Sequence, residues 1–145
     1  MRYLKLFENY EIINCLLINS KDMTIDKITI NSDDNKIKEI IGNECERYAA
    51  TIRFENGDYI FYNPVIKKSL IVDEEGMYDP SDYGFFVEGY DRNNKIYVMY
   101  GNAIVCGVNH KKGAIEDCKT HLLELKEKII FIEMNDGMPE IRETT

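Results

Sequence analysis

The stretch "RYAATIRFENGDYIFYNP", residues 47–64, decides the fold. Two runs rich in β-branched and aromatic residues flank Asn56-Gly57, and this dipeptide supplies the positive φ angles that a tight hairpin turn needs. Pro64 ends the second run, because proline has no N–H group to donate to a strand ladder. The stretch therefore predicts a β-hairpin.

Further strands are predicted on both sides of this hairpin. Isoleucines fall on both faces of residues 24–30, which predicts a strand that is covered in part on both sides. The first segment favours one or two strands, at residues 3–7 and 12–18 with a break at Glu8-Asn9, and a short amphipathic helix is the alternative. The remaining predicted strands are residues 69–73, a hairpin over residues 84–100 turned at 91–94, and residues 102–108, which follow Gly101 as the next strand of a meander.

Two helices are expected. In "NSDDNKIKEIIGN", residues 31–43, Ile37, Ile40 and Ile41 form the stripe of a helix that packs on a core, and Gly42 ends it. The second helix follows the turn "NHKKG", residues 109–113, and either Asp117 or Thr120 caps it. The run "IIFIEM", residues 129–134, either finishes this helix or forms a strand.

This order of elements predicts the α+β class: a mainly antiparallel sheet of six to eight strands, arranged as hairpins and a meander, with two short helices on one face. A length of 145 residues predicts a single domain over 1–145. Residues 135–145 carry glycine, proline and charge, and we expect them to form a loose C-terminal tail.

Charge and cysteine usage exclude several classes of function. The 26 acidic residues outnumber the 18 basic ones and give a net charge of −8. A general nucleic-acid binder or a protein that docks on anionic membranes would need a dominant positive field instead. The four cysteines form no C-x-x-C pair and the N-terminus has no signal-peptide core, so we expect reduced thiols in a cytoplasm.

Motifs for catalysis are lacking in the sequence. It contains no G-x-S-x-G elbow, P-loop or G-x-G-x-x-G fingerprint, which predicts a non-enzyme without a cofactor. One set of residue types would suit tetrahedral zinc, although its C-x3-H half does not have the usual knuckle spacing. The alternative is two small buried thiols and two surface histidines. The set is Cys106, His110, Cys118 and His121.

A ligand-binding site is the sharper expectation. Lysines on a glycine-flanked turn can meet a phosphate with ammonium and backbone N–H groups together, and tyrosines in strands can stack on a base or ribose. The alternative for the turn is a soluble hairpin tip. The candidate residues are Asn109, His110, Lys111, Lys112, Tyr62, Tyr97, Tyr100 and Arg92.

Three segments carry a resemblance: "IKEIIGNECERY" (37–48), "LIVDEEG" (70–76) and "YGNAIVCGVNHKKGAIEDC" (100–118). In this order the chain resembles a family of small uncharacterised proteins carried mostly by bacteriophages. It departs from that pattern in the strands before Asp33 and in an insert around 79–90. The resemblance implies a phage accessory protein and supplies no catalytic residue. The matching positions are Gly42, Glu74, Glu75, Gly76, Gly101, Ala103, Ile104, Val105 and Gly107.

These observations favour a non-enzymatic, cytoplasmic protein of a phage-infected bacterial cell that counters host defence by sequestering a small nucleotide-like signal. A homo-oligomer is possible, because small chains often build such a pocket between subunits. One alternative is an acidic inhibitor of a nuclease or another nucleic-acid-binding defence protein, acting through the acidic loops at 73–75 and 79–82. The other is a small nucleotide-processing enzyme. Direct binding to nucleic acid or membrane is not expected.

Overall fold

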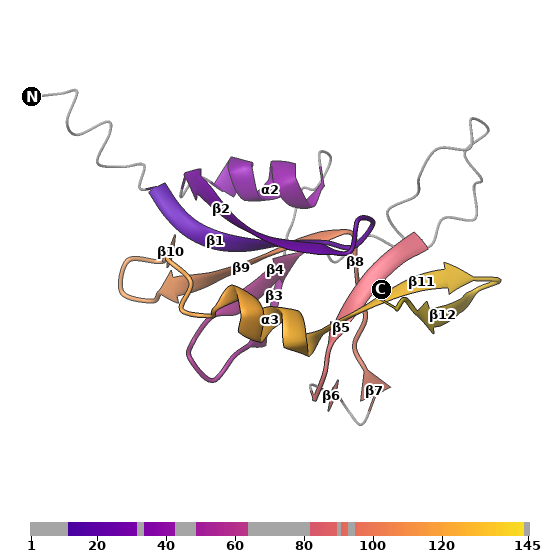
Figure 1. Ribbon diagram of the computed structural model, residues 1–145. Helices are drawn as coiled ribbons and strands as arrows, with labels where there is room; N and C mark the ends of the chain where they lie inside the picture. The colour runs from indigo at the N-terminus through magenta and orange to yellow at the C-terminus, as the bar shows by residue number, and fades with distance from the viewer. Residues whose placement is uncertain are drawn as a thin grey trace, which may run out of the picture.

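The computed structural model describes residues 12–31, 34–42, 49–63, 82–89, 91–92 and 95–143. Within them the chain forms a six-stranded sheet, a four-stranded sheet and a two-stranded ribbon, together with two helices (Figure 1). Every strand pair is antiparallel. The α+β class with a mainly antiparallel sheet is thereby confirmed, although the strands divide between sheets and do not form one.

The larger sheet has the order β2-β1-β9-β4-β3, with β10 paired to β9. Its centre is β9, which pairs on one side with β1 and on the other with β4. The hairpin predicted around Asn56-Gly57 is confirmed as β3–β4, with Gly57 at φ +95°. The strands are β1 (Ile12–Asn19), β2 (Thr24–Asn31), β3 (Ala49–Arg53), β4 (Tyr59–Tyr62), β9 (Asn102–Asn109) and β10 (Ala114–Glu116).

The smaller sheet has the order β12-β11-β5-β8. The hairpin predicted over residues 84–100 supplies β5 and β8, and a short ribbon, β6–β7, lies between them in sequence. The strands are β5 (Tyr83–Val87), β6 (Asp91–Arg92), β7 (Lys95–Ile96), β8 (Met99–Tyr100), β11 (Ile129–Asn135) and β12 (Met138–Ile141).

The two helices, α2 (Asp34–Ile41) and α3 (Leu122–Lys128), cover opposite faces of the larger sheet (Figure 1). Ile37 and Ile41 of α2 pack in one buried cluster, whereas Leu125 of α3 packs in the other. Neighbouring residues of a strand also belong to different clusters, because successive side chains point to opposite faces of the sheet. The expectation of two helices on one face was therefore wrong, because β1, β2 and β9 carry apolar side chains on both faces and each face needs a cover.

The expected meander also fails at Gly101. β9 does not pair with β8 but leaves the smaller sheet and enters the larger one between β1 and β4. Gly101 has φ +77°, its N–H donates to the Tyr83 carbonyl, and its own carbonyl accepts from the buried Ser20 hydroxyl. These two hydrogen bonds fix the corner at which the chain passes from one sheet to the other.

The chain after residue 109 differs from the prediction in three places. β10 turns back onto β9 before any helix begins, and α3 then starts with His121 at its N-cap, without a side-chain cap from Asp117 or Thr120. Residues 129–135 form β11, and the expected loose tail is wrong for residues 138–141, which pair with β11 as β12. Residues 12–19 are strand and not helix. The strands predicted at 3–7 and 69–73 lie outside the described residues.

Candidate functional site

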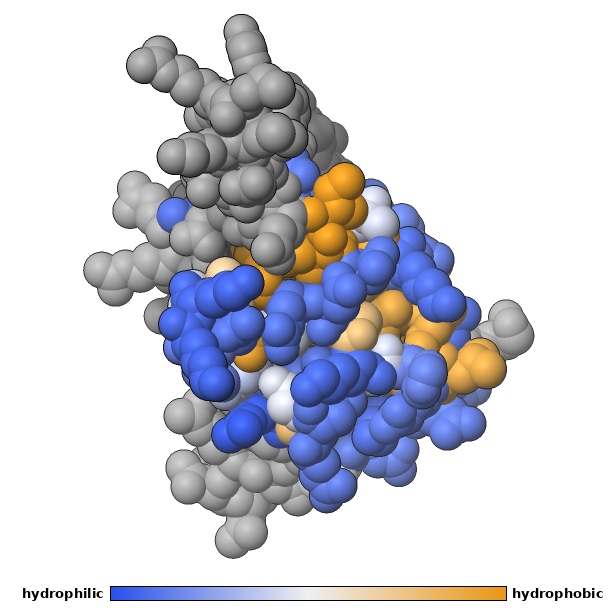
Figure 2. All heavy atoms as spheres, turned by 90° about the vertical axis from the view of Figure 1, so that its left-hand side faces the viewer, coloured by the Kyte–Doolittle hydropathy of each residue, from blue (hydrophilic) through white to orange (hydrophobic). Residues whose placement is uncertain are grey.

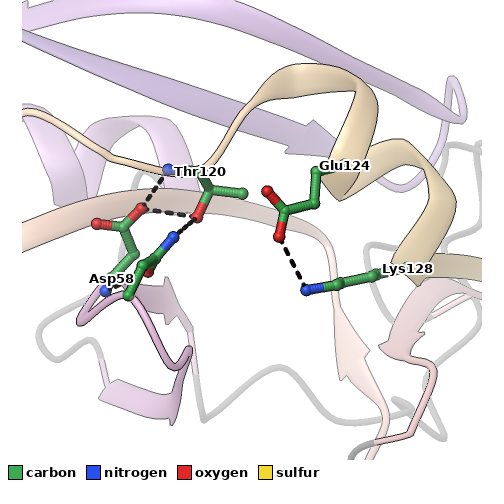
Figure 3. Close-up of polar contacts among 5 residues, drawn as sticks. Asp58, Thr120, Glu124 and Lys128 are labelled. Atoms are coloured by element: carbon green, nitrogen blue, oxygen red, sulfur yellow. Dashed lines mark hydrogen bonds and ion pairs between the residues drawn. The ribbon is translucent and has the colours of Figure 1, made fainter.

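The segment that organises the site is the connector, residues 117–121, which joins β10 to α3. Asp58, fully buried at the end of the β3–β4 turn, binds it through a single carboxylate oxygen. Oδ2 accepts hydrogen bonds from the Thr120 N–H (2.7 Å) and the Thr120 hydroxyl (2.7 Å) (Figure 3). It also accepts one from the Lys119 N–H at 2.8 Å. The same hydroxyl accepts one from the Asn56 amide at 2.9 Å. The connector is thus fastened to the β3–β4 hairpin.

A second set of bonds fastens the connector to β1. The Asn14 N–H donates to the Asp117 carboxylate at 2.8 Å, and the Cys118 N–H donates to the Asn14 carbonyl at 2.9 Å. The connector therefore runs beside β1 with its backbone anchored on both sides. Lys119 and His121 are exposed residues of a segment that is held in place, as is Asp117.

Between the connector and strands β1 and β2 lies a cavity of about 530 Å³, which we term the connector hollow. Its volume falls within the range of roughly 300–1,000 Å³ that is typical of small-molecule sites. Leu16, Ile28 and Leu122 supply apolar wall, and Thr29 supplies a hydroxyl group. The hollow can therefore hold an organic molecule with both apolar and polar parts.

The charges of the connector hollow all have one sign. The charged residues that line it are Lys27 on β2 and Lys119 on the connector, and none of the described residues in its wall is an aspartate or a glutamate. The His121 imidazole lines it as well. Acidic residues outnumber basic ones in the whole chain, which has a net charge of −8, so a wall with lysines and no carboxylate differs from the rest of the protein. Ammonium groups form charge-assisted hydrogen bonds with phosphate and carboxylate oxygens. The arrangement suits a small anion.

Two thiols near the connector hollow, those of Cys106 and Cys118, have raised pKa values and stay protonated. Burial, followed by the nearby Asp58 carboxylate, raises the pKa of Cys118 to about 11. A hydrogen bond with Cys15, together with burial, raises the pKa of Cys106 far above its ordinary value. Since the thiolate is the reactive form, Cys118 is a poor nucleophile although it lines the connector hollow.

Cys118 will therefore react slowly with iodoacetamide in the folded protein at pH 7.5. A pKa raised from 9.0 to about 11 leaves about 100-fold less thiolate at neutral pH. Mass spectrometry of the peptide that contains Cys118 gives its rate of carbamidomethylation, and the same peptide in urea is the control. Equal rates in the folded and unfolded chain would show that the thiol is not protected.

The predicted phosphate grip at residues 109–112 is built as a tight hairpin tip. The Asn109 side-chain oxygen accepts the N–H groups of Lys111 (3.1 Å) and Lys112 (3.2 Å), and Gly113 donates to the Asn109 carbonyl. These N–H groups, which were expected to meet a phosphate, are thus engaged within the turn. Lys111 and Lys112 are exposed, and the His110 ring stands edge-on to Tyr59, with centroids 6.2 Å apart. None of these residues lines the connector hollow.

The predicted aromatic residues are divided between other places. Tyr62 and Tyr97 meet ring to edge, with centroids 6.0 Å apart and their hydroxyl groups in hydrogen-bond contact, and Tyr62 is buried in the core. The Tyr100 hydroxyl lies 4.0 Å from the Met134 sulfur of β11. Arg92 lies in β6, and its side chain is outside the described part. The structure does not bring these residues together with Asn109–Lys112.

The four residues of the zinc hypothesis are all described. No group of three or more histidine, cysteine, aspartate or glutamate side chains suited to a metal ion occurs among the described residues. Two of the four, Cys118 and His121, line the connector hollow. The sequence pattern had grouped these two residues as zinc ligands. It did not point to Lys27, Lys119 or Asp58, because they are separated along the chain and form no motif.

A further hollow, of about 380 Å³, lies where the end of β1 and β2 meets α2. Its described lining includes Ile12, Ile30 and Ile40 with the carboxylate of Glu39, and no lysine, arginine or histidine. Figure 2 shows that apolar side chains gather in patches on this side of the molecule, between hydrophilic ones. Such a wall offers nothing to hold an anion. The described residues include no helix with the length and apolar character needed to span a bilayer.

Known proteins give no guide to which of these surfaces is used. A comparison of the chain with models of protein families, with curated proteins and with solved structures found no match in any of the three.

Proposed function

We propose that this chain is a non-enzymatic binding protein that sequesters a small nucleotide-like anion in the connector hollow. The observation that supports it is the wall of Lys27, Lys119 and His121, without a carboxylate among the described residues of that wall, in a chain of net charge −8. Apolar side chains beside these cations would cover the organic part of such a ligand. In the phage setting that the sequence resemblance implies, sequestration would lower the free concentration of a host defence signal.

The protonated state of Cys118 favours binding over chemistry. Cys118 lines the connector hollow next to Lys119 in sequence, and its raised pKa leaves it as a thiol at neutral pH. A ligand incubated with the protein should therefore be recovered unchanged. Chromatography of the mixture after release of the ligand tests this, and the appearance of a product would favour the nucleotide-processing enzyme instead.

Lys27→Ala should weaken the binding of nucleoside monophosphates by about tenfold or more, because it removes one charge-assisted hydrogen bond donor from the hollow. Isothermal titration calorimetry with a panel of nucleoside monophosphates gives the dissociation constants, and binding should also weaken as salt is raised. Lys112→Ala is the matched control, since it removes the same charge from the exposed hairpin tip. Equal losses in the two variants would mean that only the general field of the protein matters.

The alternative of an acidic protein inhibitor depends on loops that are largely outside the described residues. Of the acidic residues assigned to it, only Asp82 is described.

A further inference from the structure

A second cavity adjoins the connector hollow on the other side of the connector. It has a volume of about 510 Å³ and lies between the β3–β4 hairpin, the end of β5 and α3; we term it the hairpin hollow. Lys119 lines both cavities. The two hollows therefore share Lys119, and Asp58 fixes the backbone of the connector that carries it.

The hairpin hollow differs in chemistry from the connector hollow. Besides Lys119, its wall contains the cations Arg53 and Lys128 and three carboxylates, those of Glu55, Glu88 and Glu124. A phosphate group would be repelled by those carboxylates. A neutral heterocycle with N–H donors and ring-nitrogen or carbonyl acceptors would find partners for both.

An aromatic ring and an ion pair mark one wall of the hairpin hollow. Lys128 Nζ lies 3.1 Å from a Glu124 carboxylate oxygen and 5.6 Å from the centroid of the Phe54 ring. Figure 3 shows that Glu124 and Lys128 project from α3 on the side on which Asp58 meets Thr120. This wall is therefore an aromatic ring with an ammonium group over one face, and that ammonium group is paired with a carboxylate. Hydrogen bonds to a base would come from Arg53, Glu55 and Glu88 elsewhere in the wall.

We infer that the ligand is a nucleotide that spans both hollows, with its phosphate against Lys27 and Lys119 in the connector hollow and its base in the hairpin hollow. This inference rests on the proposed function and adds the position of the base. Two separate sets of contacts then contribute to the affinity. Lys27 binds the phosphate, and Arg53 and Glu88 bind the base.

The test compares GMP with ribose 5-phosphate, which has the same phosphate and sugar but no base. Calorimetry on the wild-type chain should show GMP binding at least about tenfold more tightly, since stacking and hydrogen bonding of the base add to the phosphate contact. The double variant Arg53→Gln/Glu88→Gln removes one positive and one negative charge and leaves the net charge unchanged. It should reduce GMP affinity toward that of ribose 5-phosphate and leave ribose 5-phosphate binding unaltered.

The matched control is Lys126→Gln/Glu127→Gln, which makes the same exchange of charges at exposed positions of α3 that line neither hollow. It should bind both compounds as the wild type does. Equal affinities of GMP and ribose 5-phosphate, or GMP binding that the Arg53/Glu88 variant does not change, would overturn the inference while leaving the proposed function standing. Failure of both compounds to bind the wild-type chain would overturn both.

Discussion

Asp58→Ala is expected to lower the free energy of unfolding by about 4 kcal/mol. The substitution removes the single oxygen that accepts the N–H groups of Lys119 and Thr120 and the hydroxyl of Thr120. Hydrogen bonds to a charged acceptor contribute about 1.5–3 kcal/mol each, and the sum is lowered because relief of carboxylate burial offsets part of it. Buried Thr120 would keep a donor without a partner. Urea denaturation followed by circular dichroism measures the loss.

Two milder variants distinguish the loss of these hydrogen bonds from the general effect of changing a buried residue. Thr120→Val removes the hydroxyl but keeps both backbone bonds to Asp58, and should lose about 1–2 kcal/mol. Asp58→Asn retains an oxygen acceptor and should lose less than Asp58→Ala. A loss below about 1 kcal/mol for Asp58→Ala would mean that the carboxylate does not hold the connector.

Gly84→Ala is the second substitution with a large expected effect, a loss of about 3 kcal/mol. An added Cβ at Gly84 would lie 2.6 Å from the Met99 carbonyl oxygen and 3.1 Å from side-chain atoms of Val98 and Tyr100. The obstacle is backbone, so β5 and β8 would have to separate where they pair, beside the buried Met99. Thermal and urea unfolding of the variant measure the loss.

Gly89→Ala is the matched control for this prediction. Gly89 has φ +81° with no heavy atom within 4 Å of an added Cβ, so its substitution costs only the backbone strain, about 1–2 kcal/mol. A loss at position 84 no greater than that at position 89 would show that β5 and β8 are not packed as closely as described.

Local signals explain which parts of the fold could be predicted from the sequence. Gly57 favours a hairpin through its positive φ angle, and the isoleucine stripe of α2 favours a buried helix face. The placement of β9 has no such signal, because its partners β1 and β4 are distant in sequence and the corner depends on Ser20 and Tyr83 bonding to Gly101. Tertiary contacts decided that position.

The candidate site was less accessible to sequence reasoning. A Lys-Lys pair in a glycine-flanked turn attracts notice, but Asn109 closes that turn on itself. Lys27 sits in a strand and Lys119 in an irregular connector, and only the folding of β2 against α3 brings them to one cavity. Their charge is informative only once the absence of carboxylates from the described wall is seen.

The most direct test of the central claim, that the connector hollow is the anion site, is a titration of the ¹⁵N-labelled chain with GMP followed by amide chemical shifts. We predict that the perturbed amides include those of Lys27, Thr29 and residues 118–122, together with those of residues 53–56 and 87–89 in the hairpin hollow, with the hairpin tip at 110–113 unchanged. Perturbations confined to the hairpin tip, or a spectrum that GMP leaves unaltered, would contradict it.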